Sequence, residues 1–318
     1  MISSLFSDWL WSNRNRYSSS QEALDLLGLR ERELSLLANS NVRAVITLPH
    51  ASPNLFMSRL HTVCRASELV RSGNADLHIR VVLTHTNMSD LRWRPYAWWY
   101  LDLAGNVRRK TIFTRNKRRK HVSVMSLPPL DVSLNDAREP VAGAALIARN
   151  APNLAFSYMI AMAYIERAAN LHHGVPTLYL PLDLLVEFVL SNEYKLGCIG
   201  QALQENVEYR TLNALGEVVI GNAQQAVILD HISNMRLLGT LSPATVLGGM
   251  KTERYWPHVI ESSTKLGTCQ GWFGIPPMEI VEPFNELSVP YQPSGKVVSQ
   301  LKDLKIEYSL ALALADTN

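Results

Sequence analysis

The sequence predicts an α+β protein: an N-terminal mixed domain with a short antiparallel meander, followed by a mainly helical domain. Up to about residue 125, short β-branched runs alternate with segments of helical spacing. Two adjacent prolines, Pro128 and Pro129, then interrupt both helix and strand. Beyond residue 140, helical spacing rich in alanine and leucine dominates.

The length supports two domains, because 318 residues exceed the size at which one hydrophobic core usually stops growing. The predicted units are an N-terminal arm over 1–20, an α+β domain over 21–126, a linker over 127–140 and a mainly helical domain over 141–318. The last part of the second domain, from residue 271 onward, is rich in proline and has no clear pattern.

The first domain begins with two short helices over 20–38, for which Ser19 or Ser20 supplies the cap and Gly28 the break between them. Alternating and β-branched runs predict strands over 42–48 and 77–84, with a helix over 56–71 between them. Three further strands, over 97–103, 107–114 and 118–125, are separated by turns at 104–106 and 115–117. These three strands form the predicted meander.

The second domain shows helical spacing over 141–149, 153–172, 182–190, 201–215 and 223–238. The pair His172 and His173 lies before Gly174, at the end of one predicted helix. Adjacent side chains on a helix point about 100° apart, which disfavours a paired metal or acid–base site. We interpret the pair as histidines placed against the negative helix end, with the glycine completing the C-terminus.

Composition indicates a folded protein, since 47% of the residues are hydrophobic and 19% are charged. Cys64, Cys198 and Cys269 are odd in number and far apart, which predicts free thiols in a reducing compartment and excludes a zinc site made only of cysteines. The first residues lack the pattern of a signal peptide, and no run reaches the ~18–20 uninterrupted apolar residues of a membrane span. We therefore expect a cytoplasmic protein with no membrane span.

One basic segment stands out, because no acidic residue lies between Asp102 and Asp131. It contains Arg108, Arg109, Lys110, Arg115, Lys117, Arg118, Arg119 and Lys120. The chain has 31 Lys and Arg against 28 Asp and Glu, a net charge of +3, so without these eight cations the remainder carries −5. The excess of positive charge is therefore confined to one segment, which is the pattern expected of a basic binding surface.

Like charges at this density repel one another unless an anion neutralises them, and phosphate is the commonest such anion. The segment predicts a nucleic-acid-binding protein, either a transcription regulator or a subunit of a nucleic-acid-handling complex. The segment divides into two clusters, 108–110 and 115–120, which lie about 20 Å apart along the strand at 3.3 Å per residue. The two clusters therefore either form one continuous track for a nucleic acid or face different partners. The aromatic residues Trp93, Trp98, Trp99 and Tyr100 either stack on unpaired bases or belong to the core.

Two alternatives to nucleic-acid binding stay open. In one, the protein is a structural or assembly subunit of a virus particle or secretion machine, and the basic segment docks on an acidic partner; in the other, the segment is merely solvated. The N-terminal arm carries Leu5, Phe6 and Trp9 at helical spacing. These side chains dock on a partner or a second copy, or else pack on the body of their own chain.

Catalytic and cofactor motifs are absent from the sequence. Residues 248–252 resemble the end of a phosphate-binding loop, but the first glycine of that motif is missing and lysine does not directly follow glycine. There is no dinucleotide-binding glycine motif, nucleophile elbow or zinc-protease helix. We therefore predict no cofactor, metal or catalytic residue. A dispersed catalytic site leaves no local pattern, so an enzymatic function stays open.

Residues 24–48 combine two leucine-rich helical segments with Ala38, the pair Ser40 and Asn41, and a following strand. This segment resembles the two short helices and strand of the D-type subunit of the flagellar master transcription regulator and its relatives on conjugative elements. The resemblance covers under a tenth of the chain and transfers no functional residue. It implies a transcription activator that works in a heteromeric complex on DNA.

Overall fold

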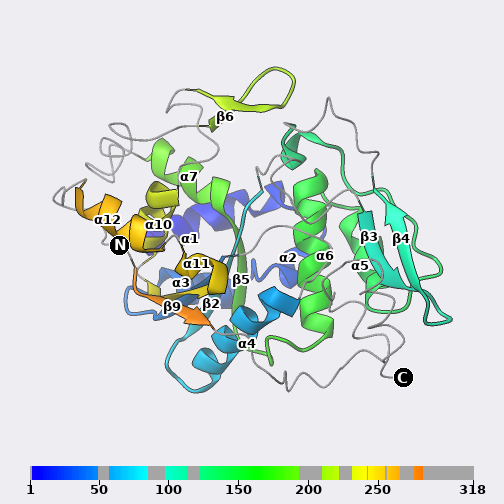
Figure 1. Cartoon of the computed structure of the whole chain (residues 1–318), viewed down its shortest axis with the longest axis horizontal. Coiled ribbons are helices and arrows are strands. Elements are labelled where there is room, and N and C mark those ends of the chain that lie inside the picture. The colour runs from blue at the N-terminus through cyan, green and yellow to red at the C-terminus, as the bar shows by residue number, and fades with distance from the viewer. Residues whose placement is uncertain are drawn as a thin grey trace.

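The computed structural model (Figure 1) describes residues 2–48, 57–84, 97–112, 122–192, 210–221, 231–241, 243–254, 256–265 and 276–281. Within these ranges the dominant feature is a five-stranded sheet in which every neighbouring pair is parallel. Its strands, in spatial order, are β5 (Thr177–Pro181), β2 (Leu77–Val82), β1 (Ala44–Thr47), β8 (Pro243–Gly249) and β9 (Met278–Val281).

This sheet shows that the predicted fold class, an antiparallel meander followed by a helical domain, is wrong. Numbered along the chain, the five strands stand in the order third, second, first, fourth and fifth, which is the order of a doubly wound α/β sheet. The sheet takes strands from both sides of residues 127–140. The arrangement is therefore α/β, with strands of the two predicted domains in one sheet.

The missed strands belong to the half that was expected to be helical. β5 is buried at every position, and β8 is a short apolar run that ends in two glycines. A strand covered on both faces has no alternation of polar and apolar residues, so its pattern resembles that of a buried helical segment. The helical expectation over 201–215 is also wrong in its described part, since β6 (Arg210–Leu212) pairs with β7 (Val218–Ile220) as a hairpin.

Helices occupy much of the remaining described chain. They are α1 (Ile2–Asn13), α2 (Gln21–Leu26), α3 (Glu31–Ala38), α4 (Met57–Arg71), α5 (Val141–Ala148), α6 (Leu154–Ala168), α7 (Leu182–Ser191), α10 (His231–Gly239), α11 (Met250–Glu253) and α12 (Trp256–Lys265). The hydroxyl of Ser20 caps α2 by accepting from the backbone N–H of Ala23. Residues 24–48 thus contain the end of α2, the whole of α3, and β1.

The two faces of the sheet are covered by different helices. On one face, Val45 of β1 and Leu247 of β8 pack with Ala66 of α4. On the other, Ile46 and Ile79 belong to the main apolar cluster, which also holds side chains of α1 and α3. Because successive strand residues point to opposite faces, this division follows directly from the alternation along each strand.

The outer edge of β5 is covered by the turn after α2. The N–H of Tyr179 donates to the carbonyl of Leu27 at 2.9 Å, and Gly28 follows with φ of +71°. A Cβ at Gly28 would lie 2.0 Å from the carbonyl oxygen of Thr177. Glycine is therefore required at this position for two reasons: the positive φ of the backbone and the close approach of β5.

Residues 127–140, predicted as a linker, pack into the body of the protein. Leu130, Val132 and Leu134 are buried in the main apolar cluster. The N–H of Leu130 also donates to the hydroxyl of Ser157 on α6 at 2.9 Å. The two prolines thus interrupt secondary structure without separating two independent cores.

The N-terminal arm is also part of the main core. Phe6 is fully buried, and its ring lies 4.9 Å from that of Phe188 on α7, while the ring of Trp9 lies 5.9 Å from the same Phe188. Leu5 is 45% exposed. Of the three side chains proposed to bind a partner, Phe6 and Trp9 therefore pack on their own chain, and Leu5 remains at the surface.

We predict that Gly28→Ala destabilises the protein far more than Gly73→Ala. Both glycines have positive φ, +71° and +73°, but only Gly28 is crowded, since a Cβ at Gly73 meets nothing within 4 Å. Backbone strain alone costs about 1 kcal/mol, and the collision with Thr177 adds to it only at Gly28. Urea denaturation of both variants measures the difference. Equal losses would show that the contact with β5 contributes nothing.

Candidate functional site

The described part of the basic segment lies in a two-stranded ribbon at one end of the longest axis of the molecule (Figure 1). β3 (Ala97–Leu101) pairs antiparallel with β4 (Val107–Thr111). Trp99 is opposite Arg109, and its two neighbours are opposite Lys110 and Arg108. The first two strands of the predicted meander are thus present. Of the third, over 118–125, residues 118–121 lie outside the described ranges, Val122 bridges to Glu217, and residues 124–126 form a 3-10 turn.

The three described cations, Arg108, Arg109 and Lys110, are all exposed on β4. The guanidinium of Arg108 binds Asp102 at 2.7 Å, and that of Arg109 lies 5.7 Å from the centroid of the Trp99 ring. The other five predicted contacts, Arg115, Lys117, Arg118, Arg119 and Lys120, lie outside the described residues. β4 therefore carries three consecutive surface cations, and Arg108 among them is paired with Asp102.

The aromatic residues of β3 lie on the strand paired with this charged strand. Trp98 is fully buried, Trp99 is 8% exposed and Tyr100 is 5% exposed. Of the two interpretations of these rings, the core position is correct, and they offer no open surface on which bases can stack. Trp93 lies outside the described residues.

Hydrogen bonds fix the ribbon to the protein body. Asp102 accepts from the backbone N–H groups of Ala104 and Asn106, at 3.0 and 2.8 Å, and so closes the turn between the strands. The backbone N–H of Asn106, more than the pairing with Arg108, holds the pKa of Asp102 at about 2. The hydroxyl of Tyr100 donates to Asp136 at 2.9 Å, which ties β3 to the buried connection 127–140. The cations on β4 therefore belong to a ribbon that hydrogen bonds hold against the protein body.

A second polar cluster lies inside the molecule, between the sheet and α6. The guanidinium of Arg80, on β2, binds Glu166 of α6 at 2.5 Å, and both side chains are almost completely buried. The hydroxyl of Tyr179, on β5, donates to Glu166 at 2.6 Å, and His172 is 3.2 Å from the same carboxylate. Arg80 also donates to the hydroxyl of Thr47, at the end of β1, at 3.3 Å.

The charge state of this cluster follows from its burial. Burial raises the pKa of Glu166, but Arg80, His172 and Tyr179 outweigh it and hold the pKa at about 2. Burial lowers the pKa of His172 despite its contact with Glu166, and it lowers that of His78 well below the usual value. The cluster therefore contains one cation, one anion and neutral histidines. The cluster is closed to solvent, and its contacts join β2 and β5 to α6.

Sequence reasoning missed this cluster, although a signal for it exists. Arg80 is the one charged residue within β2, and Glu166 interrupts an otherwise apolar stretch of α6. A charge inside a buried element requires a partner, so these two residues could have been paired from the sequence alone.

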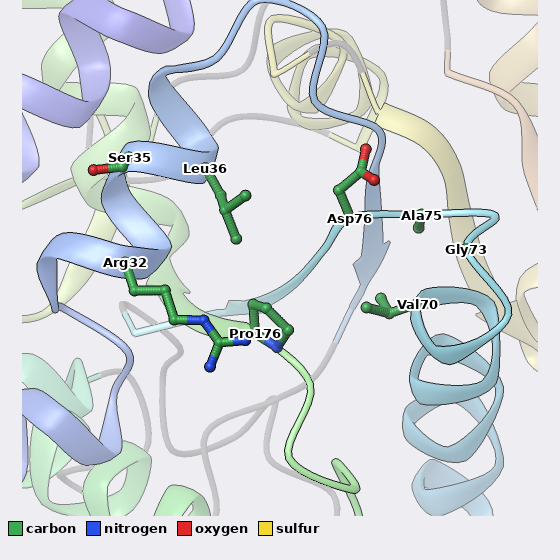
Figure 2. Close-up of a pocket in the computed structure, with 8 residues that line it drawn as sticks. All are labelled: Arg32, Ser35, Leu36, Val70, Gly73, Ala75, Asp76 and Pro176. Carbon is green, nitrogen blue, oxygen red and sulfur yellow. The ribbon is translucent and has the colours of Figure 1, made fainter.

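One hollow of about 620 Å³ lies at the amino ends of the strands. It is lined by Arg32, Ser35, Leu36, Val70, Gly73, Ala75, Asp76 and Pro176. In Figure 2, Leu36 and Val70 reach toward its centre, whereas the hydroxyl of Ser35 and the carboxylate of Asp76 point away. Asp76 is instead bound to Arg43 at 3.0 Å. The hollow thus has few convergent polar groups, and in parallel sheets ligands bind at the opposite, carboxyl end.

Among the described residues, no group of three or more His, Cys, Asp and Glu side chains is arranged to hold a metal ion. No described helix is both long and apolar enough to cross a membrane. Comparison of the sequence with protein-family models and with curated proteins finds no match to either.

We predict that Glu166→Gln lowers the free energy of unfolding by roughly 3–5 kcal/mol, because it leaves Arg80 buried without a counter-charge. The ionised carboxylate of Glu166 stabilises the folded protein above pH 4.5, and this stabilisation is lost as the pH falls toward 2. Glu187→Gln is the control, since the Glu187 pair with Arg16 is exposed and contributes at most about 1 kcal/mol. Chemical denaturation at neutral pH compares the two variants, and similar losses would contradict a special role for the buried pair.

Asp183 lies just after β5, in the first turn of α7. Burial raises the pKa of its carboxyl group to about 7. In the unfolded chain the group releases its proton near pH 3.8, so the unfolded state holds fewer protons between about pH 4 and 7. The contribution of Asp183 to stability therefore falls as the pH rises through this window.

We predict that Asp183→Asn makes the melting temperature less dependent on pH between 4 and 8, and raises it at pH 8. Asp131→Asn, at an exposed carboxylate, is the control and should leave the slope of the parent protein unchanged. Thermal melts across this range provide the measurement. A slope equal to that of the parent in Asp183→Asn would contradict the buried, protonated state.

Proposed function

We propose that this protein binds nucleic acid through β4 and the remainder of the basic segment 108–120. The observation that carries the proposal is the row of three consecutive exposed cations on the outer strand of an anchored ribbon. It lies in a stretch of sequence without acidic residues between Asp102 and Asp131. Such a local concentration of positive charge is typical of a phosphate-binding surface.

The geometry favours contact with the sugar–phosphate backbone. Arg108 and Lys110 are two residues apart on one strand, hence about 7 Å from each other along it, and point to the same side. Arg109 points to the other side, toward Trp99. Because the rings of β3 are buried, base stacking does not contribute. We therefore expect binding that depends strongly on salt and weakly on base sequence.

The remaining five cations of the segment extend the same positive charge along the chain. The resemblance of residues 24–48 to the D-type regulator subunit adds the expectation of a heteromeric complex on DNA. The role that we propose is thus a transcription regulator or a subunit of a nucleic-acid-handling complex.

We predict that the double variant Arg108→Gln and Lys110→Gln weakens binding to short DNA and RNA and flattens its salt dependence. Each lost phosphate contact lowers the slope of log K against log salt by about 0.9. The control is Arg32→Gln with Arg71→Gln, which removes the same charge from exposed positions on α3 and α4. Fluorescence-anisotropy titration at two salt concentrations measures all three proteins, and equal effects would refute a site on β4.

The other half of the segment is tested by replacing Arg118, Arg119 and Lys120 with glutamine. This variant should also bind more weakly, with little change in melting temperature. Unchanged affinity would remove these residues from the site. Absence of binding by the parent protein at low salt would refute the proposed function as a whole.

An assembly subunit is the second candidate function, and one observation favours it. Leu215 and Ile220, on the hairpin of β6 and β7, are 76% and 77% exposed. Large apolar side chains left exposed on a surface hairpin are a feature that a protein interface would cover. A defined oligomer in light scattering, free of nucleic acid and disrupted by Leu215→Lys with Ile220→Lys, would support this role.

A further inference from the structure

The acidic residue that precedes the basic segment contacts the first cation of β4. Asp102 directly follows β3, in the turn of the ribbon, and Arg108 is the second residue of β4. The Nε–H of Arg108 donates to the Oδ2 atom of Asp102 at 2.7 Å. The side chain of Asp102 is 7% exposed, whereas that of Arg108 is 54% exposed. A buried carboxylate thus holds a guanidinium that lies at the surface.

Asp102 is itself fixed by the turn of the ribbon. Its backbone N–H donates to the carbonyl of Asn106 at 3.0 Å, and its carbonyl accepts from the N–H of Gly105 at 2.9 Å. The other carboxylate oxygen, Oδ1, accepts from the N–H groups of Ala104 and Asn106. The two oxygens therefore have different partners: Oδ1 closes the turn, and Oδ2 holds Arg108.

This pairing determines what Arg108 contributes to the basic surface. The guanidinium and the carboxylate together carry no net charge, so the pair adds little to the long-range attraction of a polyanion. The carboxylate binds Nε, which leaves the edge formed by the two terminal nitrogens for another acceptor. A guanidinium held along one edge presents the other edge in a fixed direction, which suits a bidentate bond to phosphate. The contribution of Arg108 is therefore geometric.

We infer that Asp102 is a positioning residue, which orients Arg108 so that its two terminal nitrogens bind two oxygens of one phosphate of the nucleic acid. The phosphate contact rests on the proposed function, and it specifies how the first cation of β4 acts. The long side chain of Arg108 loses its conformational freedom on folding and not on binding. Such preorganisation of one side chain strengthens binding by roughly two- to tenfold.

The substitution Asp102→Asn separates positioning from charge. Asparagine keeps an oxygen for the N–H groups of Ala104 and Asn106, but it places an amide NH₂ where Oδ2 accepts from Arg108. Two donors form no hydrogen bond, so Arg108 is released while the turn keeps its acceptor. The substitution also removes one negative charge. Charge alone therefore predicts tighter binding of nucleic acid, and positioning predicts weaker binding.

The first test is fluorescence-anisotropy titration of the full chain with short DNA duplexes. We expect Asp102→Asn to weaken binding roughly two- to tenfold in spite of the lost negative charge. Asp131→Asn is the matched control, because it makes the same change of charge at an exposed carboxylate, and it should not weaken binding. Binding by Asp102→Asn that is as tight as that of the parent, or tighter, would overturn the positioning role.

A second pair of variants keeps the charge of β4 and leaves the turn intact. Arg108→Lys and Lys110→Arg both change exposed side chains, so both proteins should fold as the parent does. Lysine cannot form the bidentate bond, so Arg108→Lys should weaken binding to an extent similar to that of Asp102→Asn. Lys110→Arg should not weaken it. Equal affinity of Arg108→Lys and the parent would show that a point charge suffices and would overturn the bidentate contact.

The base composition of the duplex identifies the acceptor. Guanine also presents two neighbouring acceptors, O6 and N7, to an arginine in the major groove. Duplexes made only of A·T pairs are therefore compared with duplexes that contain G·C pairs. A phosphate contact predicts the same loss of affinity in both. A loss confined to the duplexes with G·C pairs would overturn the phosphate assignment.

A measurement on the free protein separates the orientation of Arg108 from the proposed function. A hydrogen-bonded Nε–H exchanges slowly with water, so a nitrogen–proton NMR correlation spectrum at neutral pH should show the Nε–H signal of Arg108. The signal should be absent in Arg108→Lys and lost or broadened in Asp102→Asn. Its absence in the parent would overturn the orientation. Failure of the parent to bind nucleic acid at low salt, with the signal present, would refute the proposed function and the phosphate contact while the orientation stands.

Discussion

The buried ion pair between Arg80 and Glu166 is the constraint on which the centre of the fold depends. It joins β2 to α6, and its further bonds to Thr47 and Tyr179 extend it to β1 and β5. A buried pair of charges gains little over apolar packing, yet it penalises severely any arrangement that separates the partners. A shift of β2 by one residue would turn Arg80 to the opposite face of the sheet, away from Glu166. The pair therefore specifies the register of three strands and the position of the helix above them.

The basic ribbon and the parallel sheet divide the molecule into a charged surface and a rigid interior. The ribbon of β3 and β4 is inserted between β2 and β5 along the chain and is not part of the parallel sheet. It is tied to the body through Tyr100 and Asp136. An insertion of this kind is free to acquire charge without disturbing the core.

Local features were predictable from the sequence, whereas the assembly of the strands was not. The helices around Gly28, the strands β1 and β2, and the hairpin of β3 and β4 follow from local spacing and turn residues, and their predicted positions are confirmed. The pairing of β1 with β8 joins residues about 200 positions apart and leaves no local pattern. β5 was missed because burial on both faces removes alternation. Of the candidate site, charge spacing identified the cations on β4, but the burial of Trp98 depends on the tertiary fold.

The interleaved order of the sheet has a consequence for how the chain can be divided. A fragment that stops before residue 127 contains β1 and β2 but neither β5 nor β8, so both edges of a two-stranded parallel pair are left open. Parallel pairs of this size are not stable alone, and open edges invite association with other chains. During synthesis, β1 and β2 are likewise made first. More than half of the remaining chain must follow before β8 can pair with β1. Strands from both halves of the chain therefore belong to one sheet, and neither half contains the whole of it.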